Sequence, residues 1–337
     1  MAGPNNLVGS IWNRWEPHIH APGTVLNDKY IGVDPFEDFL QRVERSEPRI
    51  RALGITDYLS YEMYEKVVAA KKSGRLGDVE LIFPNIEFRY SIGVPKGSAL
   101  NAHLLVSPEG TDHIEQLQRF LNGLEFKVVK DVFRCNKEDL IRLGKKHDSK
   151  TTDDGIALQT GTNQFKVEFN HLVERINESE WAKKNILMAI SGNEDGSAGL
   201  KDEASMAALR VELDRKAHII FSANEKVREF WLGNGPASAE ALQKKWDGRK
   251  PCIHGSDAHT NNDVGKPDLE RYTWIKGDLT FESLRQICLE PAERVFIGPM
   301  SPSTGNSSKT ITEFEISDAA WMETPTLEIN PGLVAVI

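Results

Sequence analysis

Residues 51–73, RALGITDYLSYEMYEKVVAAKKS, contain one complete strand–helix unit. Arg51–Ile55 predicts a short strand, Asp57 follows its end, and the apolar spacing of Tyr61–Ser73 is typical of a helix. An acidic residue in this place favours either a helix cap or a functional position at a strand end. The same unit recurs along most of the chain, and its repetition decides the fold class.

Runs of strand-like apolar residues alternate with helical stretches whose apolar positions recur at intervals of three and four, as in Phe36, Phe39, Leu40 and Val43. The expected strands are Ile11–Trp15, Arg51–Ile55, Leu81–Ile86, Ala102–Val106, Ile186–Ile190, His218–Phe221 and Pro251–Ile253. The expected helices are Pro35–Ser46, Tyr61–Ser73, Ile114–Asn122, Glu138–Lys146, Phe165–Asn177, Asp202–Arg215 and Ser238–Trp246.

This alternation predicts βαβ units and a parallel sheet, which makes the fold α/β. Seven units favour a closed, distorted (β/α)7 barrel. An open doubly wound sheet explains the same alternation, so periodicity alone leaves both open.

Two segments differ from the rest. Cys135–Asn163 is polar and charged, which indicates an insertion or mobile loop around one short helix. Gly298–Lys309 has the composition of a linker. The tail that follows alternates like a pair of strands and stops on an apolar run. Because natural chains rarely end on an exposed strand, we expect this chain to be cut from a longer one.

The composition excludes several classes of protein. The chain has 337 residues, 39% hydrophobic and 27% charged, which is typical of a globular protein of one large or two ordinary domains. No apolar run approaches 18 residues, so no membrane partner is expected. Three distant cysteines exclude a disulfide scaffold and suit the cytoplasm. The net charge of −9 argues against a non-specific nucleic-acid coat, although a local basic groove would still fit.

Potential metal ligands follow the expected strands. His18 and His20 form an H-x-H pair, Asp257 and His259 form a D-x-H pair, and three single residues, Asp57, Glu87 and His103, lie at other strand ends. Each alone has an ordinary structural explanation, such as a cap or a surface histidine. In an α/β barrel, however, the strand ends meet on one face. Imidazole and carboxylate ligands without thiolate suit zinc, manganese or iron, and enough are present for two ions.

In this order, the motifs EPHIHAP, GITDYLS, NIEFR, NAHLL and HGSDAHT resemble the PHP family, the polymerase and histidinol phosphatase domain. The resemblance extends over roughly Ile11 to Gly298. It implies a distorted (β/α)7 barrel that carries a metal-dependent phosphoesterase site.

More closely, the whole chain resembles the PHP module of TrlF-like, Ppl-type anti-phage proteins, in which that module is fused to an SMC-like ATPase. The stretches that carry this similarity include RWEPHIHAPGTVLND, FNHLVERINESEWAKKN and RYTWIKGDLTFESLRQICLEPAERVFIG. It implies a PHP domain over residues 1–298, a linker over 299–309 and the start of a truncated ATPase domain over 310–337.

The resemblance also implies roles for residues. His18, His20, Glu87 and Asp257 would hold one metal ion, and Glu87 would bridge to a second ion bound by His103. His259 would serve a third ion, but Tyr58 replaces the histidine of the family's T-D-H motif, so two divalent ions are expected. A histidine is also missing after the strand NILMAI, where Asn193 or Asp195 is the candidate oxygen ligand.

Further residues are candidates for catalysis and phosphate binding. Asp57 is expected to orient a ligand histidine, and His254 or His259 to protonate the leaving oxygen. Cationic candidates for the phosphate are Arg89, Arg228, Arg271 and Lys276, although for each of them taken alone an ordinary surface ion pair is the favoured explanation. Whether His171 or His147 takes part is left open.

The expected function is a metal-dependent phosphoric-ester hydrolase, a nuclease module with nucleic acid as substrate and an SMC-like ATPase as partner in anti-phage defence. Two alternatives stay open: a phosphomonoesterase for a small metabolite or nucleotide, and a catalytically inactive scaffold that regulates the ATPase. A homo-oligomer is compatible with the sequence.

Overall fold

The structure, a computed structural model, describes residues 10–93, 99–193, 195–200, 206–304, 313–315 and 326–328. The end of the predicted linker and most of the predicted ATPase segment lie outside these residues. Within the tail, β12 (Glu313–Glu315) and β13 (Thr326–Glu328) pair antiparallel, which agrees with the strand pair predicted there.

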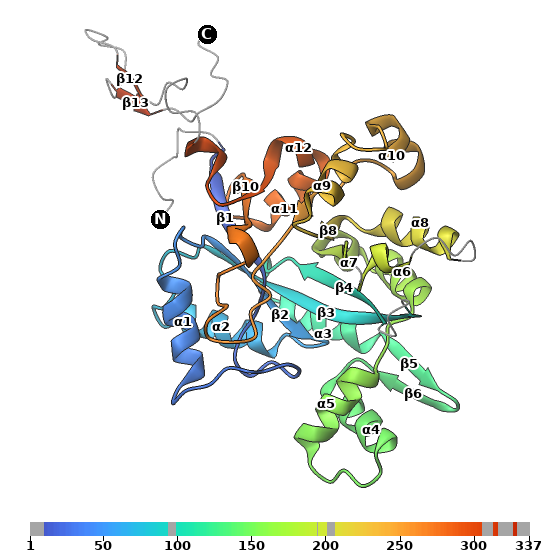
Figure 1. The fold of residues 1–337 in the computed structure, drawn as a ribbon. Helices are drawn as coiled ribbons and strands as arrows, with labels where there is room; N and C mark the ends of the chain where they lie inside the picture. Colours follow the sequence, from blue (N-terminus) through green and yellow to red (C-terminus); the bar gives the residue numbers. More distant parts are fainter. Residues whose placement is uncertain are drawn as a thin grey trace.

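A sheet of nine strands forms the centre of the molecule, in the order β11-β10-β1-β2-β3-β4-β7-β8-β9 (Figure 1). All seven predicted strands belong to it. They are β1 (Trp12–His20), β2 (Ala52–Tyr58), β3 (Leu81–Gly93), β4 (Ala99–Val106), β7 (Ile186–Ser191), β8 (Ile219–Phe221) and β9 (Cys252–Ile253). The sequence analysis missed β10 (Tyr272–Lys276) and β11 (Val295–Gly298).

The two ends of the sheet approach each other, so it forms a nearly closed, distorted barrel. Beside β9, the backbone N–H of His254 donates to the hydroxyl of Thr273 on β10, which in turn donates to the His254 carbonyl. Arg228 donates across the same seam to the carbonyl of Ile297 on β11. The prediction of an α/β barrel is therefore confirmed.

The expectation of an all-parallel sheet is wrong. β4 runs antiparallel to both β3 and β7, and β10 runs antiparallel to β1 and β11. The periodicity of apolar residues is the same in both directions, so it could not reveal this. The reversal matters for the site, because it brings the first half of β4 to the barrel face where the parallel strands end.

Helices surround the barrel, and one closes its base. Interior side chains such as Trp15, Phe83 and Leu105 pack against Phe281 and Leu284 of α11 (Phe281–Leu289). The outer helices are α1 (Pro35–Glu44), α2 (Glu62–Lys72), α3 (His113–Asn122), α6 (Phe169–Glu178), α7 (Glu180–Asn185), α8 (Ala207–Lys216), α9 (Glu225–Leu232), α10 (Ala239–Trp246) and α12 (Pro291–Arg294). Among the described residues, no helix is long and apolar enough to cross a membrane.

The segment predicted as an insertion or mobile loop around one short helix is part of a packed lobe with two helices. A hairpin of β5 (Glu125–Val128) and β6 (Asp131–Arg134) leads into α4 (Lys137–His147), which crosses α5 (Asp154–Gln164). The helices touch at glycines: a Cβ on Gly144 would lie 1.8 Å from the Ala157 carbonyl oxygen, and a Cβ on Gly161 1.8 Å from that of Leu140. These two glycines, which have no Cβ, are what allow this close crossing.

Candidate metal centre

An irregularity in β1 aims two histidines into the barrel. The pairing of β1 with β2 shifts register between Glu16 and Ile19. Trp15 packs in the barrel interior, and His18, three residues later, also points inward, which strict alternation of side chains would forbid. Bulges of this kind commonly re-aim side chains next to active sites.

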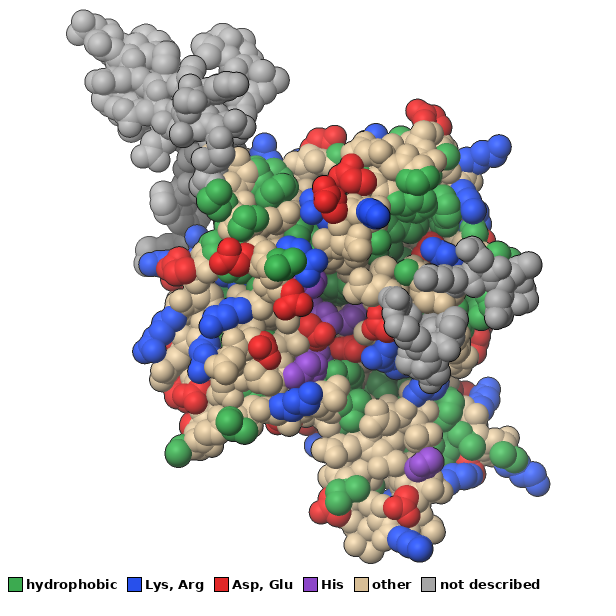
Figure 2. Space-filling view, in the orientation of Figure 1, with side chains coloured by type: hydrophobic (Ala, Val, Ile, Leu, Met, Phe, Trp, Pro, Cys, Tyr) green, Lys and Arg blue, Asp and Glu red, His purple; other side chains and the backbone are tan. Residues whose placement is uncertain are grey.

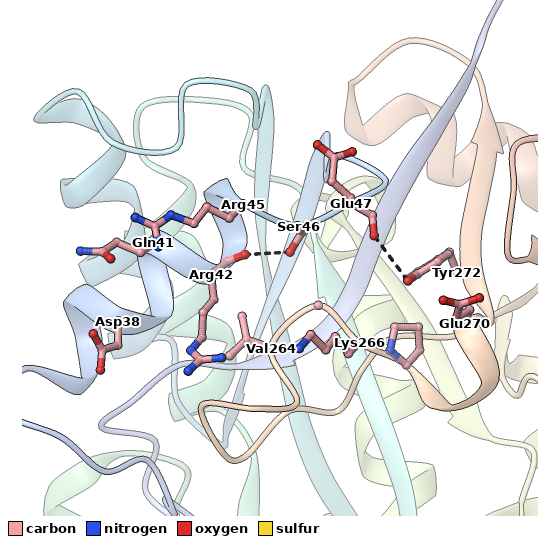
Figure 3. A pocket seen from close by; sticks show the side chains of 12 residues that line it. Asp38, Gln41, Arg42, Arg45, Ser46, Glu47, Val264, Lys266, Glu270 and Tyr272 are labelled. Atoms are coloured by element: carbon pink, nitrogen blue, oxygen red, sulfur yellow. Dashed lines mark hydrogen bonds between the residues drawn. The ribbon is translucent and has the colours of Figure 1, made fainter.

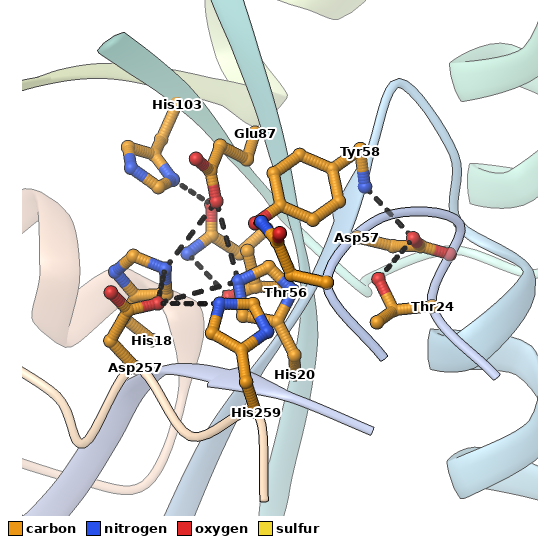
Figure 4. Close-up of polar contacts among 12 residues, drawn as sticks. His18, His20, Thr24, Thr56, Asp57, Tyr58, Glu87, His103, Asp257 and His259 are labelled. Atoms are coloured by element: carbon orange, nitrogen blue, oxygen red, sulfur yellow. Dashed lines mark hydrogen bonds and ion pairs between the residues drawn. The ribbon is translucent and has the colours of Figure 1, made fainter. Parts of the chain in front are cut away.

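Glu87 and His103 face each other across the antiparallel β3–β4 pair. The carboxylate of Glu87 lies near both β1 histidines, with Oε2 3.6 Å from Nε2 of His18 and 3.3 Å from Nε2 of His20 (Figure 4). The ring centroid of His103 is 4.7 Å from that of His18. Three strands thus contribute side chains to one point.

Asn85, which the sequence analysis did not single out, fixes the ring of His103. Its side-chain amide donates to the carbonyl of Pro17 and the hydroxyl of Thr56, so its oxygen is left to accept from Nδ1 of His103, at 3.0 Å. His103 therefore carries its proton on Nδ1 and presents the lone pair of Nε2 to the centre. Metal-binding histidines typically donate the N–H of their other ring nitrogen to such a partner, which fixes the tautomer.

Asp257 is held in place by the loop after β9. Its backbone N–H donates to the His18 carbonyl at 2.9 Å, and its φ of 49° is in the left-handed region. The preceding N–H, of Ser256, donates to the carboxylate of buried Glu16 at 2.6 Å. A Cβ on Gly255 would come within 2.5 Å of that carboxylate, so only glycine allows the loop to pass so near.

The Asp257 carboxylate completes the cluster. Its Oδ1 is 3.1 Å from Nε2 of His18 and 3.5 Å from Nε2 of both His20 and His259. Two overlapping groups have ligand atoms close enough to share an ion: His18, Glu87 and His103 form one, and His18, His20 and Asp257 form the other.

The electrostatics of the cluster favour a cation. Burial alone would lower the pKa of His18, but the carboxylates of Asp257 and Glu87 outweigh burial and raise that pKa to about 10. Burial would raise the pKa of Glu87, yet the adjacent histidines hold it well below its usual range.

The donor set fits a divalent ion. Nε2 of His18, Nε2 of His20 and Oε2 of Glu87 are buried, and among the described residues no hydrogen bond of good geometry satisfies them. They meet one another and Asp257 only as ion pairs at 3.1–3.6 Å. Buried polar atoms are normally satisfied by hydrogen bonds, so atoms that converge in this way point to a ligand that they share. Imidazole and carboxylate donors match zinc, manganese or iron.

Tyr58, the residue at the position where the resembled T-D-H motif has a histidine, lies beside the ligand cluster. Its ring stacks on that of His20, with centroids 4.9 Å apart, and lies parallel to that of His259 at 6.4 Å. Its hydroxyl accepts a hydrogen bond from the side chain of Asn27. Because this position holds a phenol and not an imidazole, His259 lacks the second imidazole that a third ion would need.

Asp57 has a different position from the one expected. Its Oδ1 accepts from the hydroxyl of Thr24 and from the backbone N–H groups of Val25 and Tyr58. No hydrogen bond joins its carboxylate to a histidine among the described residues. Asp57 therefore anchors the loop after β1, and orienting a ligand histidine is not a role that its hydrogen bonds support.

His254 and His259 both lie beside the cluster. Burial, aided by the positive charge of Arg271, lowers the pKa of His254 to about 4. A neutral imidazole suits His254 as a base or a ligand better than as an acid at neutral pH. The ring of His259 stacks on that of His20 at 4.2 Å, which leaves it as the better placed candidate for the proton donor.

The four predicted phosphate-binding residues are not all at the centre. Arg89 lies next to it, with Nη2 4.0 Å from Oε1 of Glu87, and Arg271 is an electrostatic neighbour of His254. Lys276 pairs with Trp12 at the opposite end of β1, about 20 Å from His18 at the usual rise per residue, so its assignment is wrong. Arg228 is committed to the barrel seam.

Lys166 is a cation that the sequence analysis missed. It is half-buried, and burial together with the charge of Arg89 lowers its pKa. The neighbouring Val167 donates its backbone N–H to the carbonyl of Arg89, while the Lys166 ammonium bonds to the carbonyls of Asn163 and Phe165.

The remaining candidates are not in the ligand cluster. Asp195 accepts from the hydroxyl of Ser191 and lies 3.6 Å from Arg89, and Asn193 is exposed. His171 bonds to the carbonyl of Gly123, away from the ligands, and His147 is exposed at the end of α4.

On the surface, the histidines lie at the floor of a hollow with acidic and basic side chains mixed around it (Figure 2). Another hollow, of about 690 Å³, lies between α1 and the segment that follows the Asp257 loop (Figure 3). Its charges balance, since Arg42, Arg45 and Lys266 face Asp38, Glu47 and Glu270, and none of the predicted site residues lines it.

Among known proteins, similarity is found to solved structures. No family model matches the sequence, and no curated protein matches it. Among solved structures, the chain is similar to a "putative metal-dependent phosphoesterase" from Bifidobacterium adolescentis, with 12% identity and a TM-score of 0.40. The match covers 83% of this chain and 97% of that one. Because the identity and the TM-score are this low, the metal centre is described from its own geometry alone.

Proposed function

We propose that the chain is a metal-dependent phosphoesterase that acts on nucleic acid. The observation that supports it best is the set of buried, converging ligand atoms from His18, His20 and Glu87, supplemented by His103 and Asp257. Hydrogen bonds of good geometry do not satisfy these atoms, whereas a bound cation would. Arg89, next to Glu87, adds positive charge for a phosphate group.

Each residue has a role in this proposal. His18, His20 and Asp257 would hold one ion, and His103 a second, with Glu87 between them. Two divalent ions in such a site can activate water and neutralise the charge that develops on a phosphoryl group. Asn85 holds the lone pair of His103 toward the centre, Glu16 holds the Asp257 loop, and His259 would give a proton to the leaving oxygen.

The nucleic-acid substrate and the biological setting rest on the resemblance in the sequence. An SMC-like ATPase as partner and a role in anti-phage defence remain proposals of the same kind. The mixed charge around the hollow suggests that a partner would contribute much of the affinity for a polyanion.

Hydrolysis assays test the proposal. The chain, reconstituted with manganese, is given bis(p-nitrophenyl) phosphate, p-nitrophenyl phosphate and a labelled single-stranded oligonucleotide. We expect the diesters to be cleaved and chelation to abolish cleavage. Glu87→Gln should reduce kcat at least about 100-fold, since loss of an outer partner alone costs 10–100-fold. His147→Ala, an exposed histidine, is the matched control.

Other outcomes distinguish the alternatives. Cleavage of the monoester alone would favour a phosphomonoesterase. Metal binding without hydrolysis of any substrate would contradict the enzyme and favour a scaffold.

A further inference from the structure

A small pocket shares a wall with the metal centre. Its volume is about 230 Å³, and Tyr58 forms the shared wall: one side of the residue lines the pocket while its ring stacks on His20. The pocket is lined by the end of β2, by α3 and by the α4–α5 lobe. A group bound here would lie one aromatic ring away from the predicted metal ligands.

The lining suits a flat, uncharged group. Tyr58 and Tyr61 provide aromatic surface, and Leu121, Leu140 and Leu158 provide an apolar floor. The charged residues that line it are Glu62, Glu65 and Lys137, and Lys137 is already paired with Glu62 at 3.0 Å. The excess of negative charge would repel a phosphate, which belongs with the ions and with Arg89.

The pocket also offers specific hydrogen bonds. Asn122 lines the pocket, and its Oδ1 has no hydrogen-bond partner among the described residues, so an N–H or O–H donor on a bound group would satisfy it. Oδ1 of Asn136 already caps α4 by accepting from the N–H of Asp139, while its amide N–H groups make no side-chain hydrogen bond to the part of the chain that the structure describes. Side-chain amides beside aromatic rings are what proteins use to read the edge of an unpaired base.

The walls are firmly built. The Gly144–Gly161 crossing locks α4 against α5, and the thiol of Cys135 contacts the Leu59 carbonyl at 3.7 Å, which ties the lobe to the end of β2. A preformed pocket costs little ordering on binding.

From these contacts we infer that the pocket binds the base of a nucleotide whose phosphate lies at the metal centre. The inference rests on the proposed function, and it narrows the substrate to nucleotides whose base is free to leave the stack. At about 230 Å³ the pocket takes one base and no duplex.

Binding measurements by calorimetry test the inference without requiring hydrolysis. Adenosine 5′-monophosphate and ribose 5-phosphate carry the same phosphate and differ by the base. We expect the nucleotide to bind the manganese-loaded chain at least about tenfold more tightly, since stacking of one base contributes about 1–3 kcal/mol.

Two variants test whether the preference for the nucleotide arises in this pocket. Leu158→Trp fills the pocket and Asn122→Leu removes the buried acceptor, and each should abolish the preference for the nucleotide while ribose 5-phosphate binding is unchanged. Ile156→Trp, on the exposed side of the same helix, is the control and should keep the preference. Equal affinity for the two ligands, or a preference that survives Leu158→Trp, would overturn the inference.

A failure of the proposed function can be distinguished from a failure of base binding in the pocket. If the chain retains no metal, both ligands are measured on the metal-free chain. A preference for the nucleotide that Leu158→Trp abolishes would then support base binding in the pocket without the metal centre. Equal affinity for the two ligands would reject base binding as well.

Discussion

At the scale of single residues, His103 shows how a neighbour prepares a ligand. Asn85 has its amide committed to Pro17 and Thr56, so its oxygen holds the proton of His103 on Nδ1. Burial, assisted by the charge of nearby His18, lowers the pKa of His103 to about 3, so the ring stays neutral. A neutral imidazole with its free nitrogen aimed at Glu87 is the form that binds a metal ion.

Replacing Asn85 should therefore weaken the metal site. Asn85→Ala frees the ring of His103, and we expect manganese affinity to fall about 10–100-fold in a chelator competition. The chain should also lose about 1–3 kcal/mol of unfolding free energy, because buried partners are left unpaired. Asn163→Ala, at an exposed position, is the control. Unchanged affinity in Asn85→Ala would contradict the role given to Asn85.

Replacing Tyr58 tests whether the centre can gain a metal ion. Tyr58→His creates a T-D-H sequence next to His20 and His259, so we expect the variant to bind one more ion than the parent. Metal titration followed by elemental analysis measures this. An unchanged number of ions would mean that Tyr58 is not what blocks a third site.

The sequence predicted the residues that gather at the centre better than those that support them. His18, His20, Glu87 and Asp257 were detectable because strand ends meet in a barrel. Asn85 and Glu16 lie inside strands, where a polar residue has no spacing signature. Lys276 was misplaced because its strand, β10, and the direction of that strand were not visible in the periodicity.

At the scale of elements, the α4–α5 lobe depends on two glycines. A methyl group on Gly161 would overlap the carbonyl of Leu140 on the crossing helix, and that backbone atom cannot move aside alone. We expect Gly161→Ala to lower the free energy of unfolding by at least about 1–3 kcal/mol in urea denaturation. Gly77→Ala, which meets nothing within 4 Å, should change it by less than about 0.5 kcal/mol. Equal stability of the two variants would contradict the close crossing.

Buried Asp214 on α8 gives an element-scale prediction for pH. Burial raises its pKa from 3.8 to about 6, despite Arg210 at 3.7 Å. The folded state then binds a proton that the unfolded state has released, so this contribution is present below about pH 4 and is lost as pH rises through about 6. The shift corresponds to roughly 3 kcal/mol.

Asp214→Asn should remove this dependence. We expect the variant to gain stability relative to the parent between pH 4 and pH 7, measured by urea denaturation at both values. A constant difference between the two proteins across that range would contradict a raised pKa for Asp214.

At the scale of the whole molecule, the seven predicted strands and the barrel were confirmed, because apolar periodicity reports which segments are buried. Strand direction, β10 and β11, and the nature of the α4–α5 lobe were not predicted. These features depend on contacts between distant segments, such as the hydroxyl of Thr273 against the backbone of His254, and local pattern carries no record of them.

The central claim is that the barrel gathers histidines and carboxylates in order to hold divalent ions. Elemental analysis tests it on the chain reconstituted with manganese or zinc and then desalted, beside His20→Ala and the exposed control His147→Ala. The account predicts about two ions per chain in the parent and the control, and their loss in His20→Ala. A parent chain that retains no metal, or a His20→Ala variant that retains as much as the parent, would contradict it.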